Sequence, residues 1–335
     1  MRFFHFCAHE QFPPSDLLRQ AIAAERAGFD GVGCSDHLQP WWEPGESGHA
    51  WVWLGALGNA TERVALGTGV TPAGPRYHPV LIAQAWATLE EMFPGRPFLG
   101  VGSGESLNES PLGAPWPPVG EQIERMEEAL ELIHALFEGK RISGRGKHFA
   151  TDGAFLHTRP EGRRPPIYVS AFGPQAARVA GRLGDGIWTL ADPESAPEII
   201  DAYRGAAEDA GREPGEVLLQ AAFSWAKDDD AALEAVRVWK GAQPKEFFRD
   251  DWHDPAAMFE RGEEQVSDED LREAMIVSSD PAVHVERIRE IERLGASTVV
   301  LMNNSGADPQ AAIEVYGREV LPRLGVTPAP ITKAA

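Results

Sequence analysis

Eight short runs of apolar or β-branched residues recur along the chain, each bounded by Gly, Pro or charged residues. They cover residues 2–7, 28–34, 64–70, 97–102, 166–171, 186–190, 217–226 and 298–303. Apolar residues also recur every three to four positions, the helical period, at 16–27, 80–92, 122–137, 175–183, 196–210, 231–239, 282–294 and 310–316. Alternating strands and helices are typical of a parallel sheet covered by helices, and eight such strands predict an α/β fold of the (β/α)8 TIM-barrel type.

An open doubly wound sheet is the alternative fold. That fold needs a glycine-rich phosphate turn directly after the first strand. Residues 8–14 read Ala-His-Glu-Gln-Phe-Pro-Pro and contain no glycine, so the barrel is favoured.

The barrel pattern extends over residues 1–326, which we expect to form a single domain. Two segments exceed a minimal barrel, at about 106–120 and about 241–270, and we expect them to be loop insertions at the C-terminal face. Residues 327–335 are predicted to be a flexible tail.

Charge and composition restrict the partners. The chain has 31 basic and 51 acidic residues, a net charge of −20, which disfavours nucleic acid and membrane surfaces. Two cysteines without Cys-x-x-Cys spacing favour a reducing compartment. No apolar stretch approaches the roughly 18 residues of a membrane span, and the N-terminus does not resemble a signal peptide. We therefore expect a cytoplasmic protein that acts on a small molecule.

Charged and aromatic residues follow the first four predicted strands. In a barrel the C-terminal ends of the strands converge on one mouth, so these residues form the candidate site. They are His9 and Glu10 after the first strand, residues 35–42 after the second, 68–72 after the third and 103–109 after the fourth.

Two groups in this set could move protons. An imidazole is a common general acid or base, so His37, next to Asp36, could act as either; alternatively Asp36 caps a helical turn and His37 is structural. Glu105 follows Gly102 and Gly104, which allow a ligand to approach the backbone closely. Glu105 could titrate high, or it could be an acid that favours a helix N-terminus.

Four tryptophans lie close together at positions 41, 42, 51 and 53. They could stack on a planar ligand, but packing under a loop is the better interpretation for Trp51 and Trp53. Residues 171–173 open a predicted helix, whose free N–H groups could hold the phosphate of a cofactor.

A metal site and a nucleophile are the competing chemistries. His9, Glu10, Asp36 and His37 could supply ligands, but they lack His-x-His or His-x-x-x-His spacing, so we predict no metal. No serine or cysteine lies in a nucleophile elbow.

Several segments together resemble the luciferase-like flavin and deazaflavin oxidoreductases. The nearest branch contains the coenzyme F420-dependent glucose-6-phosphate dehydrogenases, and the similarity runs in order over roughly residues 1–325. The matching segments are residues 8–12 (Ala-His-Glu-Gln-Phe), 34–41 (Cys-Ser-Asp-His-Leu-Gln-Pro-Trp), 66–70 (Leu-Gly-Thr-Gly-Val), 76–79 with 82–84, and 99–109 (Leu-Gly-Val-Gly-Ser-Gly-Glu-Ser-Leu-Asn-Glu).

The resemblance implies a barrel with a deazaflavin ring, or the isoalloxazine of FMN, across its mouth. The implied catalytic residues are His37 as base, Glu105 as proton donor to the reduced ring and Trp41 as a wall that orients the substrate, with Glu10 and Trp42 in the substrate pocket. The implied cofactor-binding residues are Asp36, the Gly69–Val70 bulge with a cis peptide, Ser103, Gly104, Asn108, Ala171, Phe172 and Gly173.

The sequence departs from the glucose-6-phosphate enzymes where they hold the substrate phosphate. Residues 189–192 read Thr-Leu-Ala-Asp, and the later positions fall near Glu260 and Ala274, with only Arg261 nearby. A site without cationic side chains binds a phosphate group weakly, so we expect a small non-phosphorylated alcohol, carbonyl or activated alkene as substrate.

Three functions are compatible with these residues. The first is an F420-dependent oxidoreductase, the second an FMN-dependent luciferase-like monooxygenase, and the third a non-catalytic flavin-binding barrel. The quoted pocket residues do not separate F420 from FMN. The resemblance also implies a homodimer.

Overall fold

The computed structural model describes residues 1–160 and 162–326 of the protein. The predicted tail, residues 327–335, lies outside the described residues. No helix in the described part of the chain is both long and apolar enough to span a membrane.

Eight parallel strands form a closed barrel, which confirms the predicted fold. Hydrogen-bonded neighbours follow the order β1, β2, β3, β5, β8, β9, β10 and β12, and β12 pairs with β1 to close the ring. All eight predicted strands are confirmed. Their bounds are Arg2–Cys7, Gly31–Cys34, Ala65–Thr68, Pro97–Gly102, Ile167–Ser170, Gly186–Leu190, Glu216–Ser224 and Thr298–Asn303.

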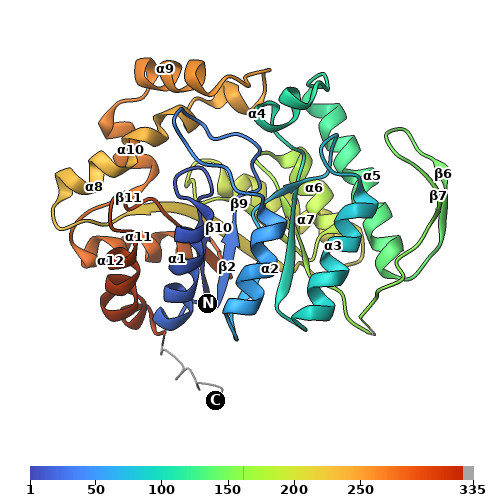
Figure 1. The fold of residues 1–335 in the computed structure, drawn as a ribbon, viewed down its shortest axis with the longest axis horizontal. Helices are drawn as coiled ribbons and strands as arrows, with labels where there is room; N and C mark the ends of the chain where they lie inside the picture. The colour runs from blue at the N-terminus through green and yellow to red at the C-terminus, as the bar shows by residue number, and fades with distance from the viewer. Residues whose placement is uncertain (161, 327–335) are drawn as a thin grey trace.

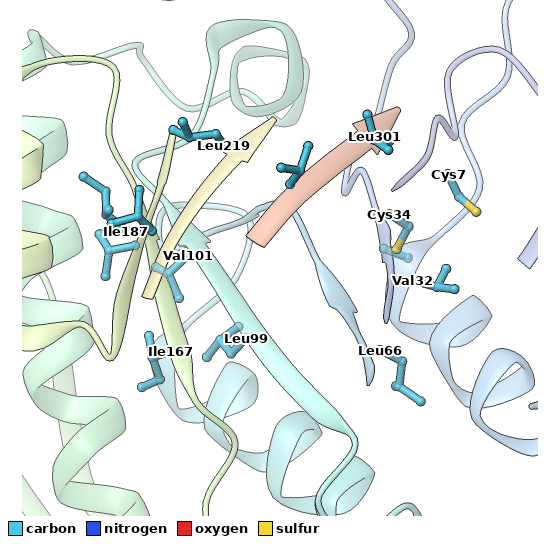
Figure 2. Close-up of a cluster of buried hydrophobic side chains, with 14 of the residues drawn as sticks. Cys7, Val32, Cys34, Leu66, Leu99, Val101, Ile167, Ile187, Leu219 and Leu301 are labelled. Carbon is cyan, nitrogen blue, oxygen red and sulfur yellow. The ribbon is translucent and has the colours of Figure 1, made fainter. Parts of the chain in front are cut away.

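Alternate residues of these strands form two apolar layers. Large side chains fill the barrel interior, including Phe4, Phe6, Phe98 and Trp188. The outward-facing side chains, including those labelled in Figure 2, belong to a second cluster shared with the covering helices. The barrel is therefore a packed scaffold rather than a pore, and chemistry is confined to its mouth.

Helices cover the outside of the barrel (Figure 1). The eight predicted helical segments are confirmed as α1, α3, α5, α6, α7, α8, α11 and α12. Their bounds are Pro14–Ala27, Pro79–Met92, Val119–Phe137, Pro174–Leu183, Ala196–Asp209, Asp229–Val236, Pro281–Arg293 and Pro309–Val315. After α8 the chain continues as a 3₁₀ helix, Arg237–Ala242, and after α12 as the short turns Tyr316–Val320 and Leu321–Leu324.

Two parts of the fold were not predicted. Helix α2, Ala50–Ala60, lies between β2 and β3, where the sequence analysis predicted no helix, and it carries Trp51 and Trp53. An antiparallel hairpin of β6, Ile142–Arg145, and β7, Ala150–Ala154, follows α5 and extends from the body (Figure 1). Two short strands, β4 (Thr71–Pro72) and β11 (Ile276–Val277), also pair with barrel strands.

The first predicted insertion follows the C-terminal end of β5, and the second follows α8 and its 3₁₀ extension. The first contains α4, Ser106–Glu109, and the 3₁₀ turn Ser110–Leu112. The second contains the 3₁₀ turn Lys245–Phe248, α9 (Pro255–Gln265) and α10 (Asp268–Ala274). Ser106 joins them, since its hydroxyl accepts from the Trp252 N–H at 2.9 Å and approaches the Trp252 carbonyl at 2.7 Å. The two insertions therefore form one rim over the mouth.

Candidate active site

His37 lies between two carboxylates at the barrel mouth. Its Nδ1 is 3.5 Å from Glu10 Oε1, and its Nε2 is 3.4 Å from Glu105 Oε2. The three residues follow β2, β1 and β5, so the convergence of strand ends brings them together as predicted. An imidazole that contacts a carboxylate at each nitrogen is arranged to pass protons.

Two consecutive hydrogen bonds through Ser35 fix the orientation of the Glu10 carboxylate. The Ser35 hydroxyl donates to Glu10 Oε2 at 2.7 Å and accepts from the His9 backbone N–H at 3.0 Å. Glu10 and Ser35 are both buried. The carboxylate of Glu10 therefore has one orientation, toward His37.

Glu105 faces the site and does not cap a helix. It is the residue before α4, but its side chain makes no capping hydrogen bond. Asn108 Nδ2 donates to Glu105 Oε2 at 3.3 Å, and Asn108 Oδ1 accepts from the N–H groups of Leu38 and Gln39. Burial raises the pKa of Glu105 from its ordinary value, and His37 opposes that rise.

Asp36 lies beside this group in a network of its own and does not cap a turn. Its Oδ2 accepts from the Thr71 hydroxyl at 2.7 Å and from the Trp51 indole N–H at 3.0 Å. The Tyr77 hydroxyl donates to Oδ1 at 3.3 Å, and the Arg76 guanidinium lies 3.4 Å from the same oxygen.

Arg76 links Asp36 to a second buried carboxylate, Glu109. The guanidinium Nε is 3.5 Å from Glu109 Oε1, and the Arg76 backbone N–H donates to Glu109 Oε2 at 2.9 Å. Burial raises the pKa of Glu109, and Arg76 opposes that rise. The sequence analysis assigned no role to Arg76, Thr71 or Ser35, although all three lie in the segments that it singled out.

The Gly69–Val70 peptide is cis, as the family resemblance implied. A Cβ at Gly69 would lie 2.5 Å from Trp188 and 2.6 Å from Phe6, so glycine is required by packing against the barrel interior. Val70 in turn fills the space left by Gly102, where a Cβ would lie 2.5 Å from a Val70 methyl carbon.

An aromatic wall borders the mouth. Trp41 lies 5.4 Å from the His37 ring centroid and 5.5 Å from that of Phe248, and Phe248 meets Phe172 edge-on at 5.7 Å. Phe172 is 53% exposed, an unusual fraction for a large apolar side chain. Trp42, predicted in the substrate pocket, is buried against Trp239 of the 3₁₀ helix Arg237–Ala242, with ring centroids 4.9 Å apart.

The start of α6 is open for an anion. Residues 171–173 lie between β8 and α6, and Gly173 at the N-cap position supplies no side chain to the helix. A Cβ at Gly173 would meet no atom within 4 Å. Free N–H groups at a helix start bind phosphate well, so this position fits the phosphate of a cofactor.

Ser103 and Gly104 connect β5 to Glu105. Gly104 has φ +90°, a left-handed conformation that favours glycine. A Cβ there would lie 3.4 Å from Glu109 Cγ, so this turn also packs closely on the Arg76–Glu109 pair.

Carboxylates offset several basic side chains in and beside the second insertion. Arg261 lies 3.4 Å from both Glu246 and Glu264. Lys240, just before the insertion, lies 3.4 Å from Glu263 and 3.7 Å from Asp268. Lys245, within the insertion, lies near enough to Asp192 to help lower the pKa of that carboxyl. These carboxylates reduce the positive charge that the rim offers a substrate phosphate.

A family model described as luciferase-like monooxygenase matches residues 1–298. The chain belongs to this family. Membership confirms the resemblance that the sequence motifs indicated, and it accounts for the cis peptide and the carboxylates around His37 appearing together at the mouth of one barrel.

Relatives within the luciferase-like family cover nearly the whole chain. An F420-dependent glucose-6-phosphate dehydrogenase of Nakamurella multipartita is 42% identical over 334 residues, 97% of this chain and 96% of the relative. An F420-dependent hydroxymycolic acid dehydrogenase of Mycobacterium tuberculosis is 38% identical over 95% of this chain and 86% of its own length.

A solved structure with the same fold is an F420-dependent secondary alcohol dehydrogenase in complex with an F420–acetone adduct. It is 33% identical to this chain, with a TM-score of 0.92 over 96% of this chain and 98% of the other. These three relatives share a cofactor in their names but differ in the substrate named.

Proposed function

We propose that this protein is a coenzyme F420-dependent oxidoreductase that transfers a hydride between the deazaflavin ring and a small non-phosphorylated alcohol, carbonyl or activated alkene. The observation that carries this proposal is His37, whose Nε2 lies 3.4 Å from Glu105 Oε2 and whose Nδ1 faces Glu10. The relatives' shared cofactor supports it.

The residues of this chain handle the proton that accompanies the hydride. When bound, the deazaflavin supplies the hydride acceptor or donor. His37 Nε2 takes the hydroxyl proton of an alcohol as the C=O bond forms, or returns it to a carbonyl in the reverse direction. Glu105, with its raised pKa, holds a proton for the reduced ring. Trp41 lies against His37 and orients the substrate carbon.

The cofactor's position is proposed from the same residues. Its phosphate would lie at residues 171–173, held by the N–H groups of Phe172 and Gly173, where Gly173 leaves the helix start open. The Ala171 N–H donates to the Trp188 carbonyl at 3.0 Å and would position the loop instead. Val70 of the cis peptide would support the ring, with Asp36, Gly69, Ser103, Gly104 and Asn108 around it.

A non-phosphorylated substrate is favoured by the charges of the rim. Arg261 is already paired with Glu246 and Glu264, and the charge of Lys245 is offset by Asp192, which follows β9. The aromatic residues Trp41, Phe172 and Phe248 offer an apolar surface instead. The secondary alcohol dehydrogenase of the same fold, solved with an acetone adduct, is consistent with this preference.

Two assays test the cofactor and the substrate. In calorimetric titrations with oxidised F420 and with FMN, we expect micromolar or tighter binding of F420 and weaker binding of FMN. Preference for FMN, with oxygen consumption on addition of the reduced form, would instead establish a monooxygenase. With F420, we expect turnover of secondary alcohols and none of glucose 6-phosphate. If a cofactor binds but neither supports turnover, the protein is a non-catalytic flavin-binding barrel; a turnover that His37→Ala abolishes while cofactor affinity is retained excludes that function.

We also propose a homodimer. Helix α2 is apolar on all sides, and its Val52 is 74% exposed, while Leu81 of the neighbouring α3 is 51% exposed. An exposed apolar helix face is typical of a surface that another subunit covers.

A further inference from the structure

The direction of each hydrogen bond around His37 follows from its partners. Besides Glu10, Nδ1 faces the Gln39 backbone carbonyl at 3.3 Å, and a carbonyl oxygen can only accept. The Gln39 carbonyl and the Glu10 carboxylate therefore both favour a hydrogen on Nδ1 of the neutral ring. The neutral ring then keeps its lone pair on Nε2, the nitrogen that faces Glu105.

Glu10 has the complementary role of an acceptor at both oxygens. Oε1 faces the Nδ1–H of His37, and Oε2 accepts from the Ser35 hydroxyl at 2.7 Å. The Ser35 oxygen itself accepts the His9 N–H at 3.0 Å, so its one hydrogen is directed to Glu10. These contacts at both oxygens hold the carboxylate in one orientation, with Oε1 toward His37.

We propose that Ser35 is a positioning residue, which orients the Glu10 carboxylate and thereby holds neutral His37 as the Nδ1–H tautomer with Nε2 open to the substrate. This inference rests on the proposed function, because the proton taken up at Nε2 is the one that accompanies hydride transfer. Without the Ser35 hydroxyl, Glu10 can rotate away from Nδ1. The Gln39 carbonyl alone then favours the Nδ1–H form, and the Nε2–H tautomer, which cannot accept a substrate proton at Nε2, becomes populated.

The test combines nitrogen NMR of ¹⁵N-histidine-labelled protein with steady-state kinetics. Signals are assigned with His37→Gln, at a pH where the imidazole is neutral. We expect wild-type His37 to be the Nδ1–H tautomer. Ser35→Ala should show a mixture of tautomers and a kcat lower by on the order of tenfold, the loss expected for one hydrogen bond to a charged group, with KM nearly unchanged.

Two further variants separate positioning from packing. Ser35→Thr retains the hydroxyl and should restore both the tautomer and most of kcat. Ser224→Ala is the matched control, since Ser224 is buried at the end of β10 and its hydroxyl has no hydrogen-bond partner among the described residues; it should change neither quantity.

The outcomes also separate this inference from the proposed function. An Nε2–H tautomer in the wild type overturns the inference even if Ser35→Ala does not fold. Ser35→Ala with the wild-type tautomer and kcat also overturns it, and leaves the F420 activity standing. Absence of F420 turnover refutes the proposed function, whereas the tautomer measurement on the protein alone still decides the role of Ser35.

Discussion

Lowering the pH should destabilise this protein through one buried histidine. His5 lies in β1, is fully buried, and neither ring nitrogen has a hydrogen-bond partner among the described residues. Burial lowers its pKa from 6.5 to about 3. The unfolded chain takes up a proton near pH 6.5 and the folded chain does not, so stability is complete above pH 6.5 and declines as the pH falls toward 3.

The full shift corresponds to on the order of 5 kcal/mol, of which about 2 kcal/mol is lost between pH 6.5 and 5. His5→Leu removes this dependence, and it should stabilise the protein at neutral pH by about 1–3 kcal/mol because an unsatisfied polar group leaves the core. The assay is urea unfolding followed by tryptophan fluorescence, at pH 7.5 and at pH 5.

A matched control is His284, also fully buried, whose nitrogens meet the Tyr316 hydroxyl at 2.8 Å and the Ser278 carbonyl at 2.9 Å. His284→Leu should destabilise the protein at neutral pH, in contrast to His5→Leu. If the stability difference between His5→Leu and the wild type is the same at both pH values, the reasoning about His5 is refuted.

Three other predictions concern the site and the assembly. Glu105→Gln should lower F420-linked turnover by about 10²-fold while leaving the calorimetric affinity for F420 nearly unchanged, and an unaltered rate would remove Glu105 from the proton path. Gly173→Asp should raise Tm slightly by capping α6 and weaken F420 binding by repelling its phosphate; equal affinity would contradict a phosphate site there. Val52→Asp should shift the protein toward monomer in sedimentation velocity. An unchanged sedimentation coefficient would show that α2 is not an interface.

The barrel strands were predictable because each is a compact apolar run with clear boundaries. Helix α2 was not, since its sequence Ala-Trp-Val-Trp-Leu-Gly-Ala-Leu-Gly-Asn-Ala is apolar on every face and shows no helical period. The β6–β7 hairpin was missed for the opposite reason. Its strands are polar, glycine-rich and largely exposed, so no alternation of apolar residues marks them.

The meeting of His37 and Glu105 was predictable because both follow barrel strands whose ends converge. The partners of Asp36 were not, because Trp51, Thr71 and Arg76 reach it from separate elements. Nor was the role of Ser35, since a hydroxyl shows its partner only when side-chain directions are known. The positions of the strands in the sequence predict which residues meet at the barrel mouth. The hydrogen bonds among those residues depend on the directions of their side chains, which only the structure shows.

The most direct test of the central claim is a calorimetric titration of the protein with oxidised F420 and with FMN, followed by secondary-alcohol turnover with wild type and His37→Ala. The account predicts micromolar or tighter binding of F420, weaker binding of FMN, and loss of turnover in His37→Ala with F420 affinity retained. Tight binding of FMN alone, or equal turnover in the variant, would contradict it.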